Sequence, residues 1–116
     1  MRAASAGDLL SAVARGDRAA FGGLYDRLGA VVFGVVAEAL RSPSGHVDAE
    51  LAEDAALDVW THLWRTAPLL ARRPLTSAEA IAWVVEEARD RCAARIVAAR
   101  RDWAPEVARW NWTASA

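Results

Sequence analysis

The sequence predicts an all-α fold: a compact bundle of about four helices with a short tryptophan-rich C-terminal tail. Apolar residues recur at helical spacing in several segments, and Ala and Arg are frequent. No stretch alternates between apolar and polar residues, as a half-buried strand would. Apolar residues make up 54% of the 116 residues, so the chain is long and apolar enough to fold around one core.

The first predicted helix runs from about Asp8 to Ala14 and ends at Gly16. Asp17 can then cap a second helix, whose apolar residues keep helical spacing to about Leu40. Four glycines weaken this second helix: Gly22, Gly23, Gly29 and Gly34. Two interpretations stay open for them, a bend near Gly29 or close packing of a neighbouring helix.

The third predicted helix begins after Asp48, a suitable N-cap, and continues to about Thr66. Its apolar stripe is expected to pack Trp60 and Trp64 inside the bundle, while carboxylates occupy the opposite side. Leu57 interrupts that charged side. It is either an ordinary exposed leucine or part of a docking face for another protein.

The fourth predicted helix starts at a capping box in residues 76–79 and runs to about Arg101. Its residues expected to face inward are Ile81, Val84, Val85, Ala88, Cys92 and Ile96. Two ion pairs are spaced to form along it, Glu86 with Arg89 and Glu87 with Arg91.

The chain divides into a helical domain, residues 1–102, and a tail, residues 103–116, that holds three of the six tryptophans. Pro105 could open a short final helix there. Two interpretations of the tail stay open: it folds back onto the bundle, or it is an exposed binding element.

Charge is unevenly distributed although the formal net charge is only −1. Residues 1–64 carry 5 Arg and 9 acids, and residues 65–116 carry 9 Arg and 6 acids. The net value gives no global attraction to nucleic acid, whereas the acidic and basic halves suit a protein with two partner-binding faces.

Enzyme chemistry is hard to build from these residues. The two histidines, His46 and His62, belong to no metal-binding motif, and no glycine-rich phosphate loop is present. The acids between residues 48 and 58 are better explained as a solvated helix face than as a metal site. The single cysteine, Cys92, is expected to be a buried, inert thiol. The sequence therefore predicts a non-enzymatic cytoplasmic protein with no cofactor, metal, small-molecule substrate or membrane span.

Three short segments follow one another along the chain. The first is AAF at 19–21 with LYDR at 24–27, the second is AED at 52–54 continuing to LWR at 63–65, and the third is AWVV at 82–85 followed by ARDR at 88–91. In this order they resemble the three conserved segments of the region 2 domain of the extracytoplasmic-function (ECF) sigma factors of the sigma-70 family. The resemblance covers about residues 8–97.

The resemblance implies a bacterial transcription-initiation protein that docks on the clamp helices of the RNA polymerase β′ subunit. It also implies that the fourth helix and the loop before it meet the promoter −10 element, and that an anti-sigma factor is a further possible partner. The residues that it places on the polymerase-binding side are Asp54, Leu57, Asp58, Thr61 and Arg65. The residues that it places near DNA are Arg72, Arg73, Arg89, Arg91 and Arg95.

Several residues depart from the family pattern. Leu57 replaces a usual Gln, and Glu86 with Glu87 places two acids where the pattern is neutral or basic. Asp90 replaces Asn, which would weaken contact with a phosphate backbone. No region 4 follows. Two functional hypotheses stay open: a sigma factor that binds polymerase and −10 DNA, or a regulatory module that binds an anti-sigma factor or polymerase without reading promoters.

Overall fold

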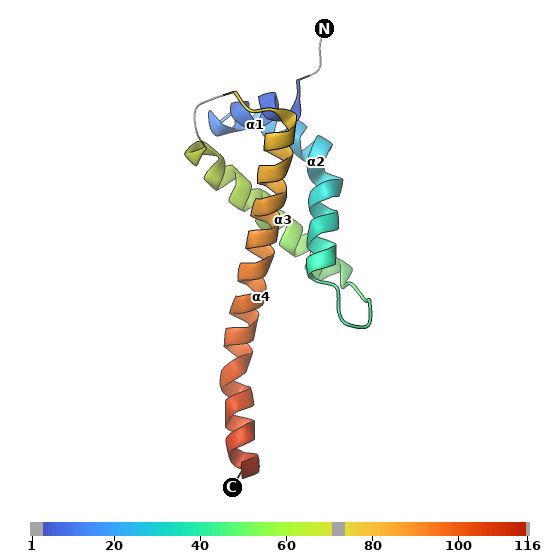
Figure 1. Ribbon diagram of the computed structural model, residues 1–116, viewed down its shortest axis with the longest axis vertical. Helices are drawn as coiled ribbons and strands as arrows, with labels where there is room; N and C mark the ends of the chain where they lie inside the picture. Colours follow the sequence, from blue (N-terminus) through green and yellow to red (C-terminus); the bar gives the residue numbers. More distant parts are fainter. Residues whose placement is uncertain (1–3, 71–73, 116) are drawn as a thin grey trace.

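Four α-helices form the chain in the order that the sequence predicts. The computed structural model describes the backbone of residues 4–70 and 74–115 and the side chains of residues 4–70 and 74–99. The elements are α1 (Ala6–Ala14), α2 (Arg18–Ala39), α3 (Ala49–Thr66), the 3-10 turn η1 (Ala67–Leu69) and α4 (Ser77–Ser115) (Figure 1). The all-α prediction is confirmed: the described backbone contains no strand.

Side chains cap three helices where the sequence predicts them. The Oδ1 atom of Asp17 accepts a hydrogen bond at 3.0 Å from the backbone amide three residues later, and Asp48 does the same at 3.2 Å. At the start of α4, Thr76 and Glu79 each accept the other's backbone amide at 3.1 Å. These contacts satisfy amides that lack a partner inside the helix, so they fix where each helix begins.

The N-terminal helix begins two residues earlier than expected and approaches the chain before α4 closely. Ser5 and Asp8 form a capping box that the sequence analysis did not identify. Between these two residues in the sequence lies Gly7, where a Cβ atom would overlap the backbone of Leu75 and Thr76. Only glycine allows this approach, which fixes α1 against the start of α4.

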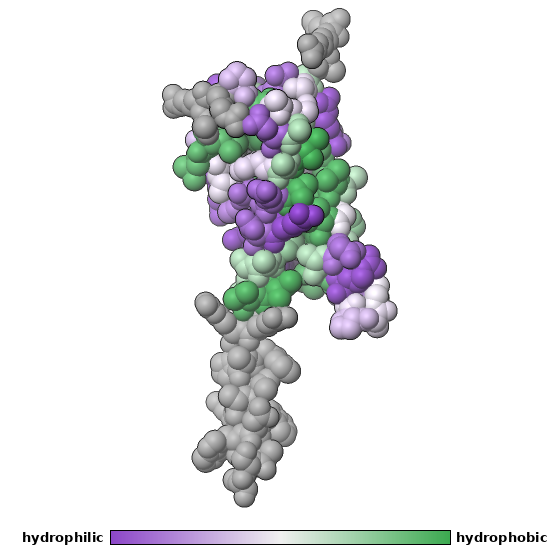
Figure 2. All heavy atoms as spheres, viewed as in Figure 1, coloured by the Kyte–Doolittle hydropathy of each residue, from purple (hydrophilic) through white to green (hydrophobic). Residues whose placement is uncertain are grey.

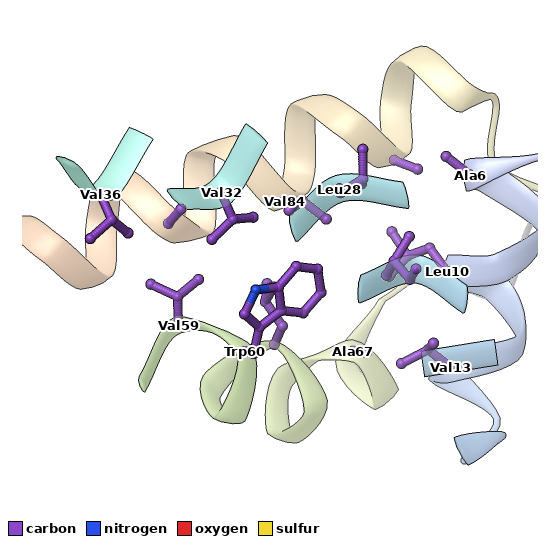
Figure 3. Packing of buried hydrophobic residues seen from close by; sticks show 14 of the residues in the cluster. Ala6, Leu10, Val13, Leu28, Val32, Val36, Val59, Trp60, Ala67 and Val84 are labelled. Atoms are coloured by element: carbon purple, nitrogen blue, oxygen red, sulfur yellow. The ribbon is translucent and has the colours of Figure 1, made fainter. Parts of the chain in front are cut away.

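The core lies where the four helices meet. Its buried members are Ala6, Leu10, Val13, Ala20, Leu24, Leu28, Val32, Val36, Ala52, Ala55, Val59, Trp60, Leu63, Ala67, Ala80, Val84, Ala88 and Cys92. Trp60 is 4% exposed, and its indole points from α3 towards the helices that carry Leu28 and Val84 (Figure 3). The predicted burial of Trp60 is therefore confirmed.

The inner side of α4 differs in part from the expectation. Ala80 is fully buried, whereas Ile81 is 38% exposed. Val85 and Ile96 are only half-buried. The buried residues of α4 recur every fourth position, and the larger aliphatic side chains lie at the edges of that stripe. Small residues at the centre let α4 pack closely on its neighbours. Trp64 likewise lies at an edge and is half-buried.

Helix α2 continues through Gly29 as one uninterrupted helix. Close packing applies to Gly23, where a Cβ atom would lie 3.3 Å from a methyl group of Leu9, while a Cβ at Gly22 or Gly34 would meet nothing within 4 Å. By length and composition alone, α2 is also apolar enough to cross a membrane, which the sequence analysis did not expect. Its residues facing α3 and α4 line the core, as those of a core helix do.

Helix α4 runs to Ser115, well beyond the other three helices, rather than ending near Arg101 (Figure 1). It passes through Pro105, so the expected separate final helix does not form. The packing of the three tail tryptophans lies outside the described side chains. The division at residue 102 stays a prediction.

Candidate partner-binding face on helix α3

Helix α3 presents one side to the core and one to solvent. Asp54, Leu57, Thr61 and Arg65 are all exposed and recur at spacings of three or four residues, so they lie along one side of the helix; we call them the α3 outer face. Leu57 at its centre is 68% exposed. The Thr61 hydroxyl donates a hydrogen bond to the Leu57 carbonyl oxygen at 3.0 Å, which holds its methyl group on the helix surface.

Acidic side chains surround the N-terminal half of this face. Glu50 and Glu53 are exposed beside Asp54, and Leu51 adds a 41% exposed apolar side chain nearby. The acids also suit the positive end of the helix dipole. The result is an apolar centre with a negative border, complementary to a partner that carries basic residues around an apolar contact.

Aromatic contacts with α2 hold α3 in place on its core side. The ring of Phe21 lies edge-on to Trp60 at 5.8 Å between ring centres and to Trp64 at 5.2 Å. Tyr25 contacts Trp60 in the same way at 5.1 Å. Edge-to-face pairs of this kind stabilise packing beyond simple burial. They fix the rotation of α3 against α2, and so determine which of its residues face solvent.

Asp58, which the resemblance places on the polymerase-binding side, pairs with Arg91, which the resemblance places near DNA. Arg91 donates from Nε to Asp58 Oδ2 at 2.8 Å and from Nη2 to Oδ1 at 3.2 Å, a two-point contact between α3 and α4. The bond from Arg91 is the main cause that holds the pKa of Asp58 below its ordinary value of 3.8. Burial opposes this shift, while the positive charge of Arg95 adds to it. The same pair raises the pKa of Arg91.

A second polar contact joins the same helices one turn away. His62 Nε2 and Glu87 Oε2 lie 2.9 Å apart, with both side chains partly buried. The two ion pairs expected within α4 are therefore not formed among the described residues: Glu87 and Arg91 bond to α3, and Glu86 with Arg89 makes no ion pair. The contacts between helices form in preference to pairs within α4, because packing between the helices partly shields them from water and so strengthens the attraction.

The two contacts form one pattern, which we call the α3–α4 clasp: Asp58 with Arg91 and His62 with Glu87. On each helix the two residues are four positions apart, and the pairing order is reversed between the helices, as antiparallel packing requires. The sequence contains this pattern: an acid and a histidine four residues apart on α3, and an acid and an arginine four residues apart on α4. The pairing between helices was not predicted, because Glu87 and Arg91 also complement each other within α4.

The predicted DNA-contacting arginines do not form one described surface. Arg72 and Arg73 lie outside the described residues. Arg95 is half-buried and close enough to act on Asp58, so it lies towards α3 with Arg91. Arg89 is exposed on another side of α4, where Glu86 and Asp90 are exposed too. Positive charge is thus offset by acids on the described part of this helix.

Within residues 4–70 and 74–99, no group of three or more His, Cys, Asp or Glu side chains is arranged to hold a metal ion. Cys92 is buried in the core, and burial raises the pKa of its thiol. A thiol in that state is a poor nucleophile. What the described side chains offer is a binding surface on a rigid support.

The chain is 33% identical over 88 residues to the ECF RNA polymerase sigma factor SigK of Mycobacterium ulcerans (strain Agy99). The match covers 76% of this chain and 42% of SigK, so the chain spans less than half the length of the curated relative it matches. No family model and no solved structure matches it. The similarity supports a relation to the ECF sigma factors.

Proposed function

We propose that this chain is a non-catalytic transcription protein of the bacterial cytoplasm that binds core RNA polymerase through the α3 outer face. The observation that carries the proposal is Leu57, 68% exposed and bordered by acids on a helix whose other side is fixed in the core. The similarity to SigK supports polymerase as the partner, since SigK is named as an RNA polymerase sigma factor.

The clamp helices of the β′ subunit, which the sequence resemblance implies, are the surface we propose for this contact. Leu57 would occupy an apolar site there, while Asp54 would meet a basic residue and Arg65 an acidic one. A central apolar anchor within a charged border is typical of interfaces whose energy is concentrated in a few residues. Asp58 contributes indirectly, by fixing α4 against α3.

Binding of the purified chain to core polymerase tests this proposal. Leu57→Arg should weaken binding by more than about tenfold, because a central contact residue contributes about 1–2 kcal/mol or more. Val97→Arg is the matched control: Val97 is 48% exposed but lies on α4 and is no part of the α3 outer face, so its change should leave binding unaltered. No binding at micromolar concentration, or equal loss in both variants, would contradict the proposal.

A second candidate function, polymerase or anti-sigma binding without promoter reading, follows from a separate observation. Arg91 is committed to Asp58, and the described part of α4 exposes Glu86 and Asp90 beside Arg89. Acids near a phosphate backbone weaken binding by repulsion. DNA contact by Arg89, Arg95 and the arginines of the 71–73 segment remains a proposal of the first, promoter-reading function.

A promoter bubble with an unpaired −10-like segment separates the two functions. Promoter reading predicts a mobility shift that falls steeply with salt, because arginines displace counterions from phosphates. A further loss of affinity in Arg89→Gln would assign Arg89 to that contact. Polymerase binding that persists with no shift on the bubble would instead establish the regulatory module.

A further inference from the structure

The side of α2 that faces away from the core is apolar and uncovered. Val31 is 42% exposed and Phe33 is 40% exposed. Ala30 and Gly34, which flank them in the sequence, are exposed as well. We call these four residues the α2 outer face. Apolar surface is visible along this helix in Figure 2. The face has no part in the polymerase contact proposed above, which uses α3.

The apolar character of this helix extends right around it. No ionisable residue occurs between Arg27 and Glu38, although only one side of that stretch lines the core. Of the most apolar 18-residue window of α2, 28% is buried. A helix that is apolar on all sides is normally covered on all sides. In the isolated chain, the outer side of this stretch therefore lacks a partner that would cover it.

Charges at the two ends of the face indicate what covers it. Arg27 and Glu38 lie about three turns apart and therefore on the same side of α2. Arg27 forms no ion pair among the described residues. Glu38 uses one carboxylate oxygen for Arg41, at 3.2 Å, and its side chain is 74% exposed. An antiparallel copy of this helix would place the Glu38 of one chain opposite the Arg27 of the other, twice.

We propose that the α2 outer face is the surface through which two copies of this chain associate, with their α2 helices antiparallel. Ala30 and Gly34 allow the helix axes to approach closely, so Val31 and Phe33 of each copy are removed from water. Two symmetric Arg27–Glu38 contacts then fix the direction and register. A two-fold contact of this kind is self-complementary and closes at two copies.

Sedimentation equilibrium of the full chain tests the association. At micromolar concentration the wild-type protein should approach twice its monomer mass of 12.5 kDa. Ala30→Glu should reduce the measured mass to that of the monomer. Ala94→Glu, an exposed alanine on α4, is the matched control and should leave the dimer intact. Thermal melts of both variants verify that they fold. A wild-type chain that stays at 12.5 kDa would overturn the proposal.

A charge exchange tests the antiparallel arrangement. Arg27→Glu and Glu38→Arg should each weaken dimerisation by about tenfold, because each replaces two attractions with two repulsions. The double variant should restore wild-type affinity. A double variant as weak as the two losses combined would overturn this register, and recovery of a monomeric chain with phospholipid vesicles would assign the face to a membrane instead. Polymerase binding by Leu57→Arg is independent of all these outcomes.

Discussion

Gly7 shows how a single hydrogen atom in place of a side chain fixes two segments together. A methyl group there would overlap the backbone of Leu75 and Thr76, which cannot withdraw as a flexible side chain could. We expect Gly7→Ala to destabilise the fold by about 1–3 kcal/mol. Gly22→Ala should instead stabilise it by about 0.5–1 kcal/mol, because no atom lies near that position in α2. Urea unfolding of both variants measures this, and equal effects would contradict the close approach.

The ion pair of Asp58 makes the free energy of unfolding depend on pH. The folded-state pKa of Asp58 lies below the ordinary value of 3.8, so its contribution is present above that pH and is lost as the pH falls through the folded-state value. Asp58→Asn should therefore be less stable than the wild type at pH 6, and this difference should shrink as the pH falls below 3.8. The loss should stay under about 1 kcal/mol, because the side chains of both partners remain partly exposed.

The control for this prediction is Asp54→Asn, since Asp54 forms no ion pair among the described residues. Unfolding by urea at several pH values should show a pH-dependent difference for the Asp58 variant alone. An equal difference at pH 6 and pH 3 would mean that the Arg91 contact does not act through charge.

At the scale of one element, α3 has two opposite surfaces, one buried in the core and one exposed to solvent. Its core side fixes the helix through Trp60, and this fixed rotation exposes Leu57. The sequence predicted both assignments, because a period of 3.6 residues separates the two sides without reference to other helices. It could not distinguish a buried Trp60 from a half-buried Trp64, since that depends on the neighbours of each ring: Phe21 contacts both, and Tyr25 contacts Trp60.

The two tryptophans should differ when each is truncated. Trp60→Ala should cost about 3–5 kcal/mol, because it leaves a cavity in the centre of the core. Trp64→Ala should cost only about 1–2 kcal/mol, because this ring is already half in contact with water. Denaturant unfolding followed by circular dichroism compares them. Equal losses would place both rings at the same depth.

At the scale of the whole molecule, the described core ends at Cys92 while α4 continues to Ser115. Removing the chain after Asp102 should therefore change the melting temperature by less than about 2 °C, equivalent to a small fraction of the folding free energy. A truncation after Arg91, which removes the buried Cys92, is the destabilising control. A clear drop for the chain that ends at Asp102 would show that residues 103–116 pack on the bundle.

The sequence by itself determined the number and order of the helices and where α2, α3 and α4 begin. Caps such as Asp17, Asp48 and the Thr76–Glu79 box act within a few residues, and the apolar period acts within one helix. The exposed Leu57 was predictable for the same reason. Helix starts and helix sides depend on residues that are close together along the chain, so they can be predicted from the sequence.

Only the tertiary structure decided which partners the charged residues take. Glu87 and Arg91 complement each other within α4, yet each bonds to a residue of α3, His62 and Asp58 respectively. The close approach at Gly7 likewise depends on two segments far apart in sequence. Packing brings such groups together, and a charge that has local and distant partners takes the one that burial strengthens.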